Sequence, residues 1–285
     1  MRGRRIAAWA AGAIALGLGA LVATGLVEAV SDPIERETTI TLPDLPRLQA
    51  PYRIALLSDI HIGNRAMQPE RLERIVAQVN AARPDLIVIA GDFVNGHGGH
   101  LASDPKALIG PLGKLRAPDG VLATMGNHDH WTDLAAVQSA LIEAGITVLN
   151  NQAIRRGPIV LLGLDDDHTG HARIAPTMQA ALELGGVPVA VSHSPDLAPH
   201  LPGQVGLFLA GHTHCGQVVL PGIGSLAPIY GKLVGDRHFF NARYRCGVIR
   251  DGERSTIVTA GLGSGGIPVR IGAPPDWWLI ALNGA

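Results

Sequence analysis

Six consecutive residues, Leu56-Leu57-Ser58-Asp59-Ile60-His61, place a carboxylate and an imidazole two positions apart. They continue a short, mostly apolar run that starts after Pro51, which predicts a buried strand ending at this motif. Successive strand side chains point to opposite faces, so Asp59 and His61 are expected to point to the same side. Because a carboxylate and a neutral imidazole both bind divalent first-row metals, the motif predicts a metal site at the strand end.

The same arrangement recurs along the chain, where short apolar runs end in Asp, Asn or His. In open α/β sheets, ligands bind at the carboxyl ends of the strands. These strand ends carry nitrogen and oxygen donors without sulfur, a set that suits Mn, Fe, Zn, Co or Mg. The donors exceed what one ion with an open position needs, so we expect two ions about 3.5–4 Å apart that share a carboxylate. The predicted metal ligands are Asp59, His61, Asp92, Asn127, His193, His212 and His214.

The elements that must position these residues alternate between strand and helix patterns, which indicates an α/β fold. Helices are expected at 70–82, 134–144 and 177–184, each from apolar residues at helical spacing. Strands are expected at 54–58, 86–90, 121–125, 146–149, 159–162, 187–191, 207–210, 218–220, 246–249, 257–260 and 277–282.

Composition narrows the function classes. The chain has 285 residues, of which 47% are apolar, so it can bury a sizeable core. A formal net charge of -1 gives no global attraction to nucleic acid, and no nucleic-acid partner is expected. Cys215 and Cys246 are the only cysteines. Two cysteines make no disulfide framework, and sequence does not tell whether they pair.

The first thirty residues carry a membrane signal. Arg2, Arg4 and Arg5 precede an uncharged run from Ile6 to Val27. As a helix this run would be about 33 Å long, enough to cross a hydrocarbon core about 30 Å thick. A cleavable signal peptide is the alternative, but its apolar region is shorter. Positive charge stays in the cytoplasm, so a single-pass anchor in the inner membrane with the main domain on the extracytoplasmic side is expected.

The expected organisation is a membrane anchor or signal segment at 1–30, a linker at 31–51 and one domain at 52–285. Several prolines make the linker non-helical. Thr38–Leu42 has the composition of an edge strand that precedes the core. The paired arginines Arg4-Arg5 also fit a twin-arginine export signal, although a pair alone is weak support.

Other polar residues have ordinary structural explanations. Asp165–His168 looks like a further metal site, but flanking glycines favour a solvated acidic turn, with a role beside the substrate as the alternative. His97 and His100 lie among glycines and are expected to form a lip after Asp92. Arg270 is expected to contact a substrate phosphate or to form a surface salt bridge.

Two further expectations concern His130, which is expected to be a loop residue, and the tryptophans Trp277-Trp278. These tryptophans are expected to pack in the core as part of a terminal strand, with a place at the membrane surface as the alternative.

The order of these blocks resembles the calcineurin-like metallophosphoesterase superfamily. The matching blocks occur in family order within residues 52–220, and such a series is very improbable by chance. They are Asp59-x-His61, Gly91-Asp92, Gly126-Asn127-His128-Asp129, His193 and Gly211-His212-x-His214. The resemblance extends to a membrane-anchored bacterial branch through Gly211–Gln217, Gly261–Gly263 and Pro268–Arg270.

The resemblance implies a fold of two mixed β-sheets packed as a sandwich and flanked by helices, with a transmembrane helix before it. It also implies roles for the residues. Asp59, His61 and His214 would hold one divalent ion, Asn127, His193 and His212 would hold the other, and Asp92 would bridge the two ions. His128 would be catalytic, with Asp129 orienting its ring.

The implied activity is hydrolysis of a phosphodiester or pyrophosphate, with a hydroxide that bridges the two ions as nucleophile. A lipid-linked or envelope substrate is expected because of the anchor. Relatives of this branch cleave UDP-2,3-diacylglucosamine in lipid A synthesis, but the outward topology conflicts with that cytoplasmic substrate. The alternatives are a non-catalytic, membrane-tethered metal-binding scaffold and an enzyme that hydrolyses a bond other than a phosphoester.

One position departs from the branch pattern. Residue 215 is often Gly in that branch, and here it is Cys215. If the backbone needs a positive φ at this position, Cys adds strain. A thiol this close to a metal also allows metal binding or oxidation, but the resemblance gives Cys215 a structural role rather than that of a ligand.

Overall fold

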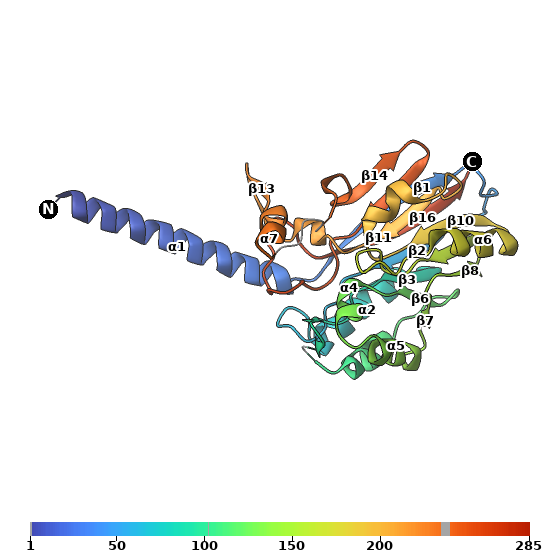
Figure 1. Ribbon diagram of the computed structural model, residues 1–285, viewed down its shortest axis with the longest axis horizontal. Helices are drawn as coiled ribbons and strands as arrows, with labels where there is room; N and C mark the ends of the chain where they lie inside the picture. The colour runs from blue at the N-terminus through green and yellow to red at the C-terminus, as the bar shows by residue number, and fades with distance from the viewer. Residues whose placement is uncertain (1, 102, 235–239) are drawn as a thin grey trace.

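The computed structural model describes residues 2–101, 103–234 and 240–285. Two six-stranded mixed sheets form the centre of the molecule (Figure 1). The first sheet contains, in order, β1 (Ile34–Leu42), β16 (Asp276–Gly284), β2 (Tyr52–Leu57), β3 (Leu86–Ala90), β6 (Val121–Thr124) and β7 (Thr147–Val148). The second contains β14 (Gly247–Asp251), β15 (Arg254–Val258), β11 (Leu207–Ala210), β10 (Val187–Val191), β9 (Ile159–Gly163) and β8 (Gln152–Arg156).

Apolar strands that are buried on both faces explain the packing of the layers. In β3, Val88 points into the core between the two sheets, where it meets residues such as Leu209 of β11. Its neighbours Ile87 and Ile89 point the other way, into the core under the first group of helices. Because strand side chains alternate between faces, a continuous apolar run supplies both layers. The predicted sandwich of two mixed sheets is therefore confirmed.

Helices cover the two outer faces of the sandwich. Side chains of α2 (Pro69–Ala81), α3 (Ile109–Leu112) and α5 (Leu134–Glu143) pack on the first sheet. Side chains of α6 (Ile174–Leu184) and of the 3-10 turn at Pro195–His200 pack on the second sheet. The remaining elements are α4 (Asn127–Trp131), α7 (Ala227–Val234), the hairpin of β4 (Gly96–His97) and β5 (His100–Leu101), and that of β12 (Val219–Leu220) and β13 (Gly224–Ser225). Three further 3-10 turns cover Pro105–Leu108, His214–Gly216 and Ala242–Tyr244.

The expected elements are present, most of them with shifted ends. The elements that were not predicted include the short helices α3 and α4 and the strands β4, β5, β8 and β13. The polar edge strand β8 has no apolar run to indicate it, because most of its side chains remain partly exposed. The helix α7 was also not predicted. The expected edge strand at Thr38–Leu42 starts earlier, at Ile34, and pairs in parallel with β16. Nine residues of the expected linker 31–51 are thus part of the first sheet.

The amino-terminal helix α1 (Arg2–Val30) projects away from the sheets (Figure 1). Its segment Trp9–Val30 is 22 residues long with a mean hydropathy of 2.0, so it is long and apolar enough to cross a membrane. Among the side chains of α1 that the structure describes, the buried ones are in its last turns, where Gly25 and Ala29 lie one helical turn apart on the same face. At the other end of the chain, Trp277 is buried in the core, as expected.

Candidate metal centre

The carboxyl ends of five strands meet at one edge of the sandwich. In the first sheet β2, β3 and β6 are parallel neighbours, and in the second sheet β10 and β11 are parallel neighbours. Parallel neighbours end on the same side, so the residues that follow them are brought together. The residues that follow these strands include Asp59, Asp92, Asn127, His193 and His212.

Backbone turns, rather than strand alternation, aim these side chains. β2 already ends at Leu57, and both Asp59 and His61 have a positive φ, 52° and 49°. Asp92, His212 and His214 also have a positive φ, so these ligand candidates make up five of the nine such non-glycine residues described. The expected geometric reason for Asp59 and His61 pointing together is therefore wrong, although they do converge. Backbone strain of this kind typically clusters at functional sites.

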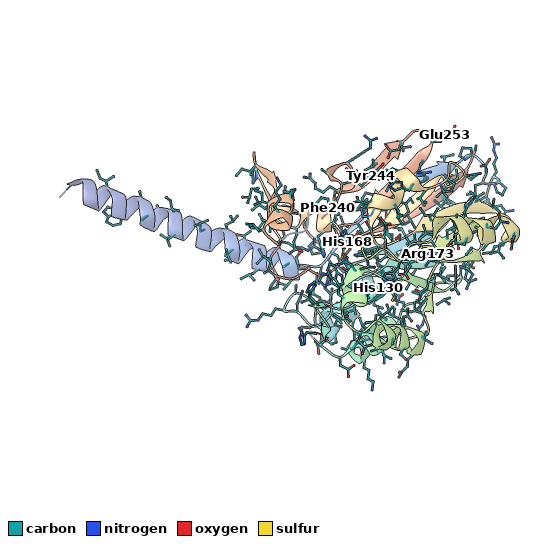
Figure 2. All side chains as sticks on the ribbon, in the orientation of Figure 1. His130, His168, Arg173, Phe240, Tyr244 and Glu253 are labelled. Atoms are coloured by element: carbon teal, nitrogen blue, oxygen red, sulfur yellow. A yellow bond between two sulfur atoms is a disulfide. The ribbon has the colours of Figure 1, made fainter. Side chains whose placement is uncertain are left out.

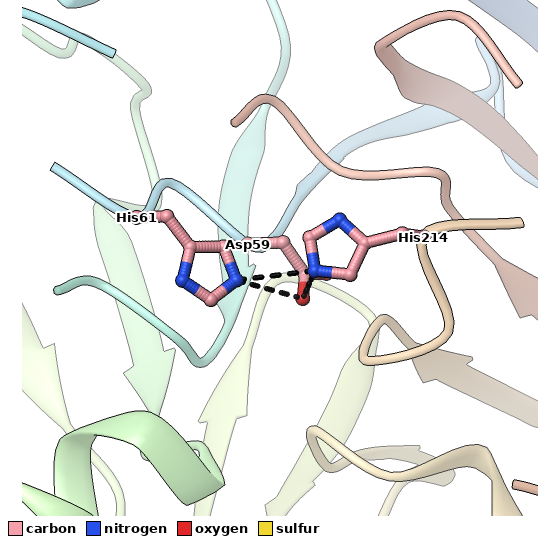
Figure 3. Close-up of side chains that lie close together, drawn as sticks. All are labelled: Asp59, His61 and His214. Carbon is pink, nitrogen blue, oxygen red and sulfur yellow. Dashed lines mark hydrogen bonds and ion pairs between the residues drawn. The ribbon is translucent and has the colours of Figure 1, made fainter. Parts of the chain in front are cut away.

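Asp59, His61 and His214 form one compact group (Figure 3). The Nε2 atoms of His61 and His214 lie 3.1 Å apart, and His214 Nε2 lies 3.3 Å from Asp59 Oδ1. His61 Nε2 lies 3.8 Å from the same oxygen. All three residues are buried, so three potential ligand atoms face one another away from bulk solvent.

A second group forms beside the first around His193. His212 Nδ1 lies 3.2 Å from His193 Nε2 and 2.9 Å from the side-chain oxygen of Asn127. The other ring nitrogen of His193, Nδ1, is 2.7 Å from the carbonyl oxygen of Ala90 at the end of β3. This contact with a backbone carbonyl orients the ring, as is usual for histidines that bind metals.

Asp92 lies between the two groups. Its Oδ2 atom is 3.5 Å from His61 Nε2 and 3.1 Å from His193 Nε2. Its other oxygen, Oδ1, accepts a hydrogen bond from the backbone N–H of His128 at 2.8 Å. The structure thus brings all seven predicted ligands together, with Asp92 at the centre of the set.

The charges of the site fit divalent cations. Burial raises the pKa of Asp59, but His214, His61 and His193 outweigh burial and lower that pKa below its ordinary value. Burial also raises the pKa of Asp92, and again the neighbouring histidines, His193 first, bring it well below the ordinary value. Two ionised carboxylates therefore lie close together at a buried site. Among the described residues Asp59 Oδ1 has no hydrogen-bond partner, a deficit that a bound cation would remove.

His128 lies at the edge of the metal centre. Its ring stands edge-on to His61, with centroids 4.8 Å apart, and its Nδ1 is 2.6 Å from the carbonyl oxygen of Gly96. Burial lowers the pKa of His128 to about 4, although Asp92 acts in the opposite direction. The expected role of Asp129 in orienting this ring is wrong, because the Gly96 carbonyl takes that position.

Asp129 instead holds the backbone that carries the ligands. Its carboxylate accepts hydrogen bonds from the backbone N–H groups of Asp92, Phe93 and Gly126 at 3.0, 2.9 and 2.9 Å. A further N–H, that of Val94, lies at 3.3 Å. Asp129 therefore ties the turn after β3 to the turn after β6 and positions two ligand-bearing loops at once.

Two glycines allow these turns to pack closely. A Cβ atom on Gly211 would lie 2.5 Å from Asp59 Oδ2 and 2.6 Å from Ser58 Cβ. A Cβ atom on Gly126 would lie 2.5 Å from the backbone nitrogen of Asp92. Any side chain at these positions would displace a predicted ligand, which explains the glycine in the Gly-Asn-His-Asp and Gly-His-x-His blocks.

Arg270 is neither a phosphate contact nor a surface salt bridge, so both expectations for it are wrong. It is fully buried, and it donates hydrogen bonds to the carbonyl oxygens of Gly263, Ala260 and Ala273. Its Nη2 atom lies 3.0 Å from His214 Nδ1. Burial lowers the pKa of Arg270 to about 10, so the side chain remains charged at neutral pH and fastens the loop 260–273 against the metal centre.

Replacing Arg270 with Met is expected to lower the free energy of unfolding by about 3–5 kcal/mol, because buried carbonyl groups lose their charged donor. Urea unfolding followed by circular dichroism measures the change. Arg74→Met is the matched control. Arg74 is exposed, and its ion pair with Asp32, at 4.0 Å, is long and solvated, so this substitution should change the free energy of unfolding little. Equal stability of the two variants would contradict the structural role of Arg270.

Cys215 and Cys246 form a disulfide that joins the metal-ligand loop to the segment before β14. Cys215 follows His214 directly and has a positive φ of 53°, the backbone strain considered from the sequence. A disulfide-bonded sulfur is no thiolate ligand, so Cys215 is structural in this state. The bond instead fixes one end of the loop that carries His212 and His214.

Removing the disulfide with Cys215→Ser plus Cys246→Ser should lower the free energy of unfolding by about 3–4 kcal/mol. The reason is that the bond closes a loop and so restricts the unfolded chain, by an amount that depends on the length of the loop. Thermal and urea unfolding under non-reducing conditions measure it. The single variant Cys246→Ser should lose nearly as much, because one missing partner already breaks the bond. Stability equal to that of the parent chain in both variants would show that the bond contributes nothing.

The acidic turn at Asp165–Asp167 is not simply solvated, which corrects the favoured explanation for its first two residues. Asp165 and Asp166 are buried, and Asp165 Oδ1 lies 2.8 Å from His130 Nε2. His130 lies in α4 rather than in a loop, and it forms a partly buried polar pair with Asp165. His130 and His168 lie near the middle of the molecule, between α1 and the far ends of the sheets (Figure 2).

Trp131 was not singled out from the sequence. Its ring packs edge-on against His128 with centroids 5.2 Å apart, and also against His97 and His168 at 4.8 and 5.6 Å. His97, expected to form a lip after Asp92, does lie beside the site through this contact. Trp131 directly follows the Asn-His-Asp-His run, and that position was the only signal that could have indicated it.

Comparisons with known proteins agree with this geometry. Residues 52–216 match the calcineurin-like phosphoesterase family. An uncharacterized metallophosphoesterase of Bacillus subtilis is 31% identical over 284 residues, which cover 97% of this chain and 94% of that protein. A Danio rerio transmembrane protein with a metallophosphoesterase domain is 31% identical over 93% of this chain, which spans only 61% of that protein.

A solved structure of a dimetal phosphatase from Danio rerio is also similar, with a TM-score of 0.46 and 15% sequence identity. The similarity covers 75% of this chain and 88% of that one.

Proposed function

This chain belongs to the calcineurin-like phosphoesterase family and is a metallophosphoesterase, and from that premise we propose that it hydrolyses a phosphodiester or pyrophosphate at a centre of two divalent ions. The single observation that carries the proposal is the convergence of seven nitrogen and oxygen ligand candidates around the buried carboxylate of Asp92. A set of this size exceeds the needs of one ion with an open position.

Asp59, His61 and His214 would hold one ion, and Asn127, His193 and His212 the other, with Asp92 shared between them. The short distances within each group and the central place of Asp92 support this division. Two such ions supply Lewis-acid charge for a phosphoryl group and a hydroxide nucleophile near neutral pH. The donor set suits Mn, Zn, Fe or Mg.

His128 would act on the substrate rather than on the metal ions. The Gly96 carbonyl occupies its Nδ1, so Nε2 remains available to the reacting group. The ring must gain a proton before it can give one to a leaving oxygen, and the negative charge of a bound phosphoester favours that gain. Asp129 would be a positioning residue, because it holds the backbone of Asp92 and Gly126.

The substrate we propose is a phosphoester linked to a lipid or to the cell envelope. The support is α1, which would anchor the domain 31–285 to the membrane. The arginines in the first turns of α1, before its apolar run, favour an extracytoplasmic domain, and the disulfide fits an oxidising compartment. UDP-2,3-diacylglucosamine contains the pyrophosphate bond that the proposed chemistry would cleave. It does not fit an extracytoplasmic domain, because nucleotide sugars are cytoplasmic.

The test uses the full chain in detergent, stripped of metal with chelator and reloaded with Mn. We expect two bound ions per chain by elemental analysis and metal-dependent hydrolysis of bis-p-nitrophenyl phosphate. A p-nitroanilide amide serves as the control for hydrolysis of another bond. Full metal loading without cleavage of any phosphoester would refute the proposal and favour a tethered metal-binding scaffold.

A further inference from the structure

Exposed apolar side chains gather on the segments that surround the end of α1. Their exposed fractions lie between 56% and 81%, and it is the grouping of several such side chains, rather than the exposure of any one, that marks a contact surface. They belong to the tip of the β12–β13 hairpin, to one face of α7 and to the loop before Arg270. We call this set the apolar rim, and it consists of Ile223, Ile229, Leu233 and Ile267.

Hydrogen bonds connect two of the segments that carry the apolar rim, the loop before Arg270 and the β12–β13 hairpin, to α1. The N–H of Arg270 donates to the carbonyl oxygen of Gly25 at 2.9 Å, and the N–H of Ala273 donates to the Glu28 carboxylate at 3.1 Å. The same loop is also bonded to the β12–β13 hairpin, where the N–H of Val219 donates to the carbonyl oxygen of Ile271 at 2.7 Å. The hairpin and the end of α1 thus pack on the same short loop. In Figure 1, α7 and β13 are drawn just above the last turns of α1, on the side of the sheets from which α1 projects.

The composition of these segments is that of a membrane interface. From Gln217 to Val234 the sequence contains no acidic residue and a single cation, Lys232. In α7, Ile229 and Leu233 are one turn apart and both exposed, with Lys232 beside them. A short helix with an apolar face and a lysine whose charge reaches the headgroups is typical of elements that lie in the surface of a bilayer.

We propose that the apolar rim is a second membrane contact, in which Ile223, Ile229 and Leu233 enter the headgroup boundary of the leaflet that α1 exits. This inference rests on the proposed anchoring role of α1. A helix that crosses the bilayer places the segments beside its end at the bilayer surface. The occupant is the lipid bilayer rather than a protein, because the segments that carry the rim are hydrogen-bonded, through the loop at Arg270, to the end of an apolar helix of membrane-spanning length.

The consequence concerns the metal centre. Arg270 contacts Gly25 of α1 through its backbone and lies 3.0 Å from His214 through its side chain. One residue therefore separates a predicted metal ligand from the membrane helix. The rim would fix the domain against the leaflet, so that the centre meets phosphoesters held at the lipid surface rather than those diffusing in solution.

The test places a nitroxide spin label at single introduced cysteines in the full chain, reconstituted in phosphatidylglycerol–phosphatidylcholine vesicles. Both native cysteines are in the disulfide, so an introduced cysteine is the only free thiol. Labelled positions are Ile223→Cys, Ile229→Cys and Leu233→Cys. Ile142→Cys and Leu182→Cys, on exposed apolar positions of α5 and α6, are the matched controls, and Leu16→Cys reports on α1.

Accessibility to oxygen, which is concentrated in lipid, is compared with accessibility to a water-soluble nickel complex. We expect lipid-like values at the rim and at residue 16, and water-like values at residues 142 and 182. Water-like values at the rim with lipid-like values at residue 16 would overturn the rim alone. Water-like values at residue 16 would overturn the anchor and the rim with it. Spin coupling between copies at the rim would identify a dimer contact and also overturn the proposal.

A kinetic test gives a second readout. Leu233→Glu is compared with Ile142→Glu on bis-p-nitrophenyl phosphate and on a p-nitrophenyl phosphodiester that carries a long alkyl chain in vesicles. For Leu233→Glu we expect about a tenfold lower kcat/KM on the vesicle substrate, the ratio for losing the burial of one leucine-sized side chain, and an unchanged rate on the soluble one. Equal behaviour of the two variants would contradict the proposal.

Discussion

Asp92→Asn is expected to abolish phosphoester hydrolysis and to lower the metal content below two ions per chain. Asn keeps the shape of the side chain but removes the negative charge between His61 and His193, 3.5 and 3.1 Å from Asp92 Oδ2. Because two-ion stabilisation of phosphoryl transfer contributes several kcal/mol, the rate should fall by more than about 1,000-fold. Elemental analysis and turnover of bis-p-nitrophenyl phosphate measure both effects.

The matched control is Asp167→Asn, which makes the same chemical change in a partly buried turn outside the set of ligands. It should retain two ions and a rate within about threefold of the parent chain, as is usual for a change away from the reacting groups. Circular dichroism of Asp92→Asn checks that the fold persists. Full metal content with near-normal turnover in Asp92→Asn would rule out the bridging role.

His128→Ala is expected to separate catalysis from metal binding. Loss of a general acid typically lowers kcat by about 100-fold to 10,000-fold. The metal content should stay at two ions, because the seven proposed ligands are untouched. The variant therefore differs from Asp92→Asn in one measurable respect: it retains metal without activity.

The structure makes this experiment informative, because the His128 ring also lies close enough to His61 and Asp92 to complete a metal-binding group. If His128→Ala loses an ion, His128 is a ligand and the proposed division of roles is wrong. His100→Ala is the control, since His100 is an exposed histidine of the nearby hairpin β4–β5. It should leave both metal content and rate unchanged.

The two metal groups depend on loops that are held by side chains with no direct role in chemistry. Asp129 joins the turns after β3 and β6, and Arg270 holds the loop against His214. The disulfide fixes the backbone beside His214. These three connections come from different parts of the chain, so the backbone of the ligand-bearing loops is held in place by several independent contacts. This support explains how five positive-φ ligand candidates are tolerated.

The sequence by itself determined the buried central strands and the polar residues that follow them. Runs such as Leu86–Ala90 and Val187–Val191 are apolar throughout, and the structure has strands over these same bounds. The reason is local: a strand buried on both faces needs an uninterrupted apolar run, and its parallel neighbours end at the same edge. The convergence of the seven ligand candidates therefore followed from residue types and order.

Only the tertiary structure decided the contacts between distant segments. Arg270 looked like a surface or substrate residue because its carbonyl partners have no signature in sequence. Asp129 was assigned to its neighbour His128, yet most of its partners are backbone N–H groups of a loop about 36 residues away, at Asp92 and Phe93. The disulfide and the partly exposed strand β8 could not be predicted either, because both depend on which segments the fold brings side by side. Backbone groups are identical at every residue, so their hydrogen-bond partners are set by the fold and not by the side-chain pattern.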